Sequence, residues 1–112
     1  MTIHIIEDDP GVADALALLL AQLGHQTVVH CDAESFFENP PPAAHDTVIV
    51  DLGLPGLTGI QVIRWIDQLQ VRPKVIAITG QPKRVIMEMV ADYTPAILLR
   101  KPLTEEALVE HL

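Results

Sequence analysis

The segment DTVIVDLGLPGLTG, residues 46–59, shows how this chain is built. Its first five residues are mostly apolar and β-branched, which predicts a short buried strand. Asp51 follows that run directly, and two glycines and a proline between residues 52 and 58 predict a turn-rich loop. Apolar residues then recur with helical spacing from residue 60 to residue 69. The segment therefore predicts a buried strand that ends in a carboxylate and leads through a loop into a helix.

This alternation of strand and helix occurs five times along the chain. Further strands are predicted at residues 3–6, 26–30, 74–78 and 96–99. Capping residues or apolar periodicity predict further helices between Pro10 and Gly24, after Asp32, from Pro82, and from Thr104 to Leu112. Strands that are apolar along nearly their whole length are covered on both faces. The chain is thus predicted to be an α/β protein, with a doubly wound, five-stranded parallel sheet and helices on both faces.

The composition excludes several classes of protein. A chain of 112 residues has room for one domain, here residues 1–112. Fifteen acidic residues against seven Lys and Arg give a net charge of −8, which argues against binding to nucleic acid or to an anionic membrane. Cys31 is the single cysteine, which excludes an internal disulfide and suits the reducing cytoplasm. No signal peptide or membrane-spanning run is visible. Because the last helix is short, we expect the N-terminal part of a longer protein, cut within that helix.

Polar side chains of catalytic type follow four of the five predicted strands. They are Glu7 and Asp8 after the first strand, Asp51 after the third, Thr79 after the fourth and Lys101 after the fifth. Ligands of open parallel sheets bind beyond the carboxyl ends of the strands, so these groups are expected to converge. Carboxylates that lie close together repel one another, and they suit a hard cation such as Mg²⁺ or Mn²⁺. With the charge of Lys101 and the hydroxyl of Thr79, they predict a pocket for a phosphoryl group, in which Asp51 is the nucleophile.

Four motifs, in this order, resemble the receiver domain of two-component response regulators. They are Ile6-Glu7-Asp8-Asp9, the run from Val50 to Gly59, Ala77-Ile78-Thr79-Gly80 and Arg100-Lys101-Pro102. The resemblance covers the whole chain and implies the flavodoxin-like strand order 2-1-3-4-5, with the second strand at an edge.

The same resemblance implies a role for each site residue. Asp51 is similar to the phosphoacceptor of the family. The Mg²⁺ or Mn²⁺ ion would be bound directly by Asp8, through water by Glu7, by Asp51 and by the backbone carbonyl of Gly53. Thr79 resembles the switch hydroxyl of the family. Lys101 resembles its phosphoryl-site lysine, and the bond from Lys101 to Pro102 is expected to be cis.

The resemblance also implies partners. The phosphoryl donor would be a phosphohistidine on a sensor histidine kinase or a phosphotransfer protein. An output domain in the same chain, commonly a DNA-binding one, would regulate transcription. Phosphorylation is expected to change docking or to form a homodimer on one surface of the domain, although Leu98 replaces the aromatic residue by which the family usually reports activation. That surface would draw on Arg84, Met87, Glu88, Arg100 and Glu105.

Three other functions fit parts of the pattern. A Mg²⁺-dependent phosphatase with an aspartyl-phosphate intermediate would commonly carry a second aspartate two residues after the nucleophile, where this chain has Gly53. A flavin-binding module of similar topology would need a first loop rich in Ser, Thr and Gly, whereas Glu7, Asp8 and Asp9 would repel a phosphate. A degenerate receiver that only dimerises is disfavoured by the intact acidic pair, acceptor, threonine and lysine. We therefore expect a phosphorylatable switch that is not an enzyme acting on external substrates.

Overall fold

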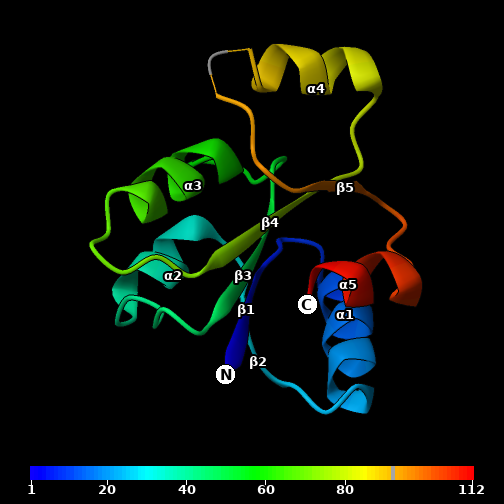
Figure 1. Ribbon diagram of the computed structural model, residues 1–112. Coiled ribbons are helices and arrows are strands. Elements are labelled where there is room, and N and C mark those ends of the chain that lie inside the picture. Colours follow the sequence, from blue (N-terminus) through cyan, green and yellow to red (C-terminus); the bar gives the residue numbers. More distant parts are fainter. Residues whose placement is uncertain (92) are drawn as a thin grey trace.

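A five-stranded parallel sheet with helices on both faces forms the whole domain, as the computed structural model of residues 1–91 and 93–112 shows (Figure 1). The strands are β1 (Thr2–Ile6), β2 (Gln26–His30), β3 (Thr47–Asp51), β4 (Lys74–Thr79) and β5 (Leu98–Arg100). The helices are α1 (Pro10–Gln22), α2 (Ala33–Glu38), α3 (Gly59–Asp67), α4 (Lys83–Met89) and α5 (Glu105–His111). The strand order β2-β1-β3-β4-β5 confirms the predicted topology and places β2 at an edge.

Each face of the sheet contributes to its own apolar core. Figure 1 shows α1 and α5 together on one side of the sheet and α2 and α3 on the other. Alternate strand residues divide between the two sides, because successive side chains of a strand point to opposite faces. The first core joins Ile3, Ile5, Ile49, Ile76 and Ile78 to Leu16 and Leu20 of α1 and Leu108 of α5. The second joins Ile6, Val48, Val50 and Ala77 to Phe36 of α2 and to Val62, Ile63 and Ile66 of α3.

Side-chain caps begin most of the helices where the sequence predicts them. The Asp9 carboxylate accepts hydrogen bonds from the backbone amides of Gly11 and Val12. Thr58 and Gln61 form a reciprocal capping box at the start of α3, and Thr104 accepts from the Ala107 amide. In the described part of the chain, no helix is long and apolar enough to cross a membrane.

The predicted bounds of β5 are wrong by two residues at the start. The ladder with β4 begins at Leu98, whereas Ile97 contributes only its carbonyl, which accepts from the Ala77 amide. β3 and β4 each run one residue further than predicted, to Asp51 and Thr79. These two site residues are therefore the last members of paired strands, and the sheet itself fixes their backbones.

Two histidines and an aspartate form a small polar cluster beneath α2. His4 Nδ1 lies 3.4 Å from His30 Nε2, and His4 Nε2 lies 3.4 Å from Asp46 Oδ2. The His30 ring is buried and packs edge-on against Phe36. Burial, together with the nearby His4, holds the pKa of His30 below its usual 6.5.

We predict that this cluster makes a pH-dependent contribution to the stability of the domain. Because the unfolded chain protonates His30 more readily than the folded one does, the contribution of His30 is present above its unfolded pKa of 6.5 and is lost as the pH falls below that value. The raised pKa of Glu7 acts in the opposite direction, so the difference between a His30 variant and the wild type isolates the contribution of His30. Urea unfolding between about pH 7.5 and about pH 5.5 measures this loss, which the His30→Gln variant should reduce. The His25→Gln variant serves as the control, since it removes a histidine outside the cluster. An unchanged pH dependence in His30→Gln would contradict the prediction.

The start of α3 lies directly against the end of β3 at Gly59. A Cβ atom built on Gly59 would stand 2.4 Å from the Asp51 carbonyl oxygen and 2.8 Å from Leu52 Cα. Both are backbone atoms of the buried strand end and cannot move aside locally. The absence of a side chain at Gly59 therefore sets how closely α3 approaches Asp51.

Gly59→Ala should accordingly destabilise the domain by about 1–3 kcal/mol, the usual cost of overpacking a core, and displace the Asp51 backbone. Gly80→Ala is the matched control, because a Cβ there would meet only the flexible Lys101 side chain, at 3.5 Å. Chemical unfolding of both variants provides the measurement. Equal stability of the two would refute the close-packing argument.

Candidate functional site: an acidic cluster with a lysine

Three carboxylates meet at the carboxyl end of the sheet. Glu7 and Asp8 follow β1, and Asp51 ends the neighbouring strand β3. One oxygen from each of Glu7, Asp8 and Asp51 lies within 4.8 Å of the others. Glu7 and Asp51 are buried, whereas Asp8 is exposed. The structure thus brings together the acidic residues expected from the sequence, and it leaves one of them open to solvent.

Lys101 joins two of these carboxylates. Its Nζ lies 2.9 Å and 3.0 Å from the two oxygens of Glu7, and 3.3 Å from Asp51 Oδ2. The lysine follows β5, and the peptide bond from Lys101 to Pro102 is cis, as expected. The side chain therefore crosses from β5 past β4 and β3 to reach the end of β1. Glu7 and Lys101 are 94 positions apart in the sequence, so this contact exists only in the folded sheet.

The burial of these groups shifts their protonation in opposite ways. Burial raises the pKa of the Glu7 carboxyl to about 7, against the hydrogen bond from Lys101, and the charge of Asp51 adds to the rise. Burial alone would lower the pKa of Lys101. The hydrogen bonds to Glu7 and the charge of Asp51 outweigh that effect and raise the Lys101 pKa above its ordinary 10.5. The lysine is therefore a fixed positive charge, while Glu7 is poised to gain or lose a proton.

Thr79 and Gly53 complete the surroundings of Asp51. Asp51 pairs with Ile78 in the sheet, which makes the fully buried Thr79 the next residue along the neighbouring strand. The Thr79 hydroxyl oxygen accepts a hydrogen bond from the Gln81 amide at 3.1 Å, so its own hydrogen stays available to donate. The Gly53 amide donates to Asp51 Oδ1 at 3.0 Å and holds that oxygen in place.

The residue beside the Asp51 carboxylate on the loop, Gly53, has no side chain. A Cβ atom on Gly53 would stand 3.4 Å from the side-chain nitrogen Nε2 of Gln81 and 3.6 Å from Asp51 Oδ1. Glycine therefore leaves the approach to this carboxylate free from the side of the loop, and the Gln81 side chain occupies the space nearby.

The donor set fits a divalent cation. Carboxylate oxygens are the ligands that Mg²⁺ prefers, and this ion usually takes only one or two of them together with water. Glu7, Asp8 and Asp51 offer oxygens at mutual distances that allow one ion to contact more than one residue. Lys101 supplies a single charge against three carboxylates, so a cation would reduce the repulsion that remains.

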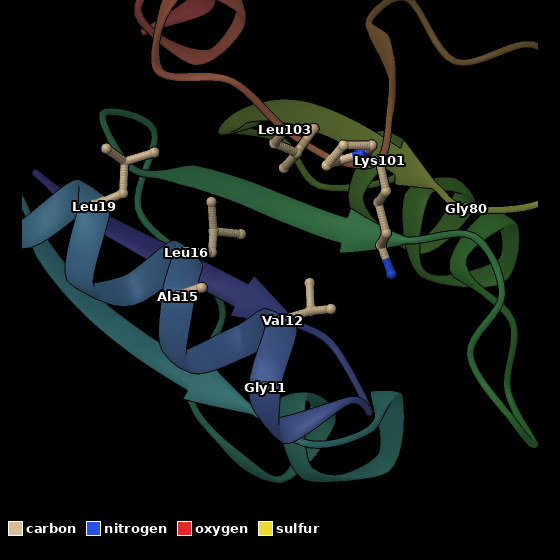
Figure 2. A pocket seen from close by; sticks show the side chains of 9 residues that line it. Gly11, Val12, Ala15, Leu16, Leu19, Gly80, Lys101 and Leu103 are labelled. Atoms are coloured by element: carbon tan, nitrogen blue, oxygen red, sulfur yellow. The ribbon is translucent and has the colours of Figure 1, made fainter.

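An apolar groove adjoins this cluster, and the sequence did not indicate it. The groove measures about 510 Å³ and is lined by Gly11, Val12, Ala15, Leu16, Leu19, Gly80, Lys101, Pro102 and Leu103. Figure 2 shows side chains of α1 that face Leu103 across the groove, with the Lys101 side chain extended at its far end. The groove therefore places apolar side chains next to Lys101, the one residue that it shares with the cluster.

Known proteins share this sequence pattern. The family model of the response regulator receiver domain matches residues 3–112. The transcriptional regulatory protein FixJ of Rhizobium meliloti is 28% identical over 110 residues, which are 97% of this chain and 53% of that protein. The sensory transduction protein RegX3 of Mycobacterium tuberculosis H37Rv is 33% identical over 86 residues, 75% of this chain and 37% of that protein. The match to the FixJ proteins of Rhizobium meliloti and Azorhizobium caulinodans covers nearly all of this chain, but the chain spans only about half the length of those proteins.

Solved structures share the fold. The crystal structure of FixJ-N superposes with a TM-score of 0.82 at 24% identity and covers 98% of this chain and 88% of its own. Full-length FixJ from B. japonicum superposes with a TM-score of 0.81 at 25% identity, over 97% of this chain and 54% of its own. With the family model matched along almost the whole sequence, this chain belongs to the receiver domains of two-component response regulators.

Proposed function

We propose that Asp51 accepts a phosphoryl group and that this modification switches the domain between two signalling states. The observation that carries the proposal is the position of Asp51. Its carboxylate is buried at a strand end, with Lys101 Nζ 3.3 Å away and two further carboxylates beside it. A nucleophile, a fixed positive charge and a candidate cation site are the parts that phosphoryl transfer needs.

In the proposed transfer, an oxygen of Asp51 forms a bond to phosphorus while the phosphorus–nitrogen bond of a phosphohistidine breaks. The bonding pair leaves with the imidazole nitrogen of the donor, a histidine kinase or phosphotransfer protein. The Lys101 ammonium lies next to Asp51 Oδ2, where it would stabilise negative charge on the phosphoryl oxygens. The Thr79 hydroxyl has a free hydrogen and would donate to the same group.

Mg²⁺ or Mn²⁺ is the proposed cofactor, bound directly by Asp8, by Asp51 and by the Gly53 carbonyl, and through water by Glu7. When bound, the ion would neutralise charge on the phosphoryl oxygens. In the structure, the buried Glu7 and Asp51 share the Lys101 ammonium.

The domain is proposed not to be an enzyme for external substrates. Gly53 stands two residues after Asp51, and it carries no acid or base that could protonate a leaving group. The domain would then catalyse only its own phosphorylation and dephosphorylation.

We further propose an output through transcription, because the relative FixJ is a transcriptional regulatory protein. The protein would act in the cytoplasm through an output domain in the same chain. The surface around α4 and β5 would transmit the signal, since only Ile86 of α4 is buried and Met87 remains 62% exposed.

Incubation with acetyl phosphate and Mg²⁺ should add one phosphoryl group to the chain. Asp51→Asn should abolish the adduct, because the amide nitrogen replaces the nucleophilic oxygen, and a chelator should suppress it in the wild type. Intact-mass spectrometry detects the adduct. A wild-type chain that gains no mass, or an Asp51→Asn variant that gains it equally, would overturn the proposal.

Beryllofluoride, which mimics the phosphoryl group, should promote self-association or docking through the surface around α4 and β5. Sedimentation of the treated and untreated protein measures the change. Met87→Glu should weaken the association by about tenfold, since it places a charge in an apolar contact, and Leu18→Glu on α1 is the exposed apolar control. Identical sedimentation with and without beryllofluoride would count against this role.

A further inference from the structure

The loop between β3 and α3 carries Gly53 next to Asp51, and few polar contacts hold it in place. The Leu52 amide donates to the Ile78 carbonyl at 2.9 Å, which fixes the beginning of the loop to β4. Further along, the Gly53 backbone amide donates a hydrogen bond to Asp51 Oδ1, and the Thr58 backbone amide donates one to Gln61 Oε1. Neither of these two bonds ties the loop to another part of the fold.

Leu54 anchors the loop in the apolar core, and Glu34 of α2 adds a hydrogen bond from a different element. Its Oε1 accepts a hydrogen bond from the Leu57 amide at 3.3 Å. Among the described residues, this is the hydrogen bond that joins positions 53–58 to an element other than β3 and α3, which flank the loop. The two residues are 23 positions apart, so the bond depends on how α2 packs beside the loop.

The same carboxylate lies against the tightest turn of the loop. Gly56 has a φ of +70°, a conformation that residues with a side chain rarely adopt. A Cβ atom at Gly56 would stand 3.1 Å from Glu34 Oε1. Glycine therefore allows both the turn and the close approach of Glu34 to its backbone.

α2, which carries Glu34, is anchored to the rest of the fold. Ala33 and Phe36 are buried in the core, and Asp32 caps the helix through the Ser35 amide at 2.7 Å. Glu34 lies in the first turn of α2, where the helix dipole stabilises a negative charge. The anchored helix can thus hold an exposed carboxylate in a defined place.

We propose that Glu34 is a positioning residue that holds the β3–α3 loop so that Gly53 presents its backbone to the cation and to Asp51. The proposal rests on the function proposed for Asp51. Glu34 does not touch the carboxylate cluster, and it acts through the Leu57 amide and the turn at Gly56. Its removal would leave the fold intact but widen the range of loop positions at Gly53.

Three variants separate the hydrogen bond from other effects. Glu34→Ala removes the acceptor, while Glu34→Gln keeps an amide oxygen that can accept from Leu57 and loses only the charge. Glu38→Ala is the matched control, an exposed glutamate of the same helix with no side-chain hydrogen bond among those found. Calorimetric titration with Mg²⁺ gives the cation affinity, and hydrogen exchange of the Leu57 amide by NMR reports on the contact directly.

Glu34→Ala should weaken Mg²⁺ binding by about 3- to 10-fold, the factor that corresponds to one net hydrogen bond, and it should speed exchange at Leu57. Glu34→Gln should stay within about twofold of the wild type because its oxygen replaces the acceptor. Glu38→Ala should match the wild type in both measurements. All three variants should still unfold cooperatively, with the melting temperature lowered by no more than about 4–8 °C in Glu34→Ala.

Wild-type affinity and exchange in Glu34→Ala would overturn the proposal. So would Glu34→Gln binding as weakly as Glu34→Ala, because the charge would then act through space, and so would an equal loss in Glu38→Ala. A wild-type chain that binds no Mg²⁺ and forms no adduct on Asp51 would instead overturn the proposed function. The wild-type titration therefore tells the two failures apart.

Discussion

The contact between the Lys101 ammonium and two buried carboxylates organises this end of the molecule. Lys101 Nζ lies within 3.3 Å of oxygens from both Glu7, which follows β1, and Asp51, which ends the adjacent strand β3. Two buried like charges so close together would be costly without a partner, and a buried ion pair that loses one partner is strongly destabilised. The lysine therefore permits β1 and β3 to end in acids at the same place.

The compensation by Lys101 is incomplete, and this incompleteness prepares the site for a cation. Three carboxylates face one ammonium, and the burial of Glu7 raises its pKa to about 7. Near neutral pH, Glu7 can reduce the excess negative charge by holding a proton. A divalent cation would also reduce the excess negative charge, while leaving the Glu7 carboxylate ionised. Binding of a proton and binding of a cation at this cluster would therefore oppose each other.

The sequence predicts the fold and the edge of the sheet at which the site lies, but not the contacts inside the site. Apolar strands with helical runs between them lead to a doubly wound sheet, and the strand ends then locate Glu7, Asp51, Thr79 and Lys101 at one edge. The start of β5 was misplaced because apolar character continues through Ala96 and Ile97, before the backbone pairs with β4. Periodicity describes which residues are apolar, whereas strand bounds depend on hydrogen bonds to a neighbour.

Distant side-chain pairs are harder to predict for a related reason. The bonds from Lys101 to Glu7 and from Leu57 to Glu34 join positions 94 and 23 residues apart, and each depends on the depth at which a helix or loop packs. The glycines show what fixes that depth. Gly59 lets α3 come within contact of the Asp51 backbone, and Gly56 lets Glu34 approach the loop. A glycine in the sequence predicts a turn, but only the packed structure shows which neighbour occupies the space that its missing side chain leaves. The distances within the cluster of Glu7, Asp51 and Lys101 thus depend also on glycines, which carry no reactive group and let helices and loops pack closely around it.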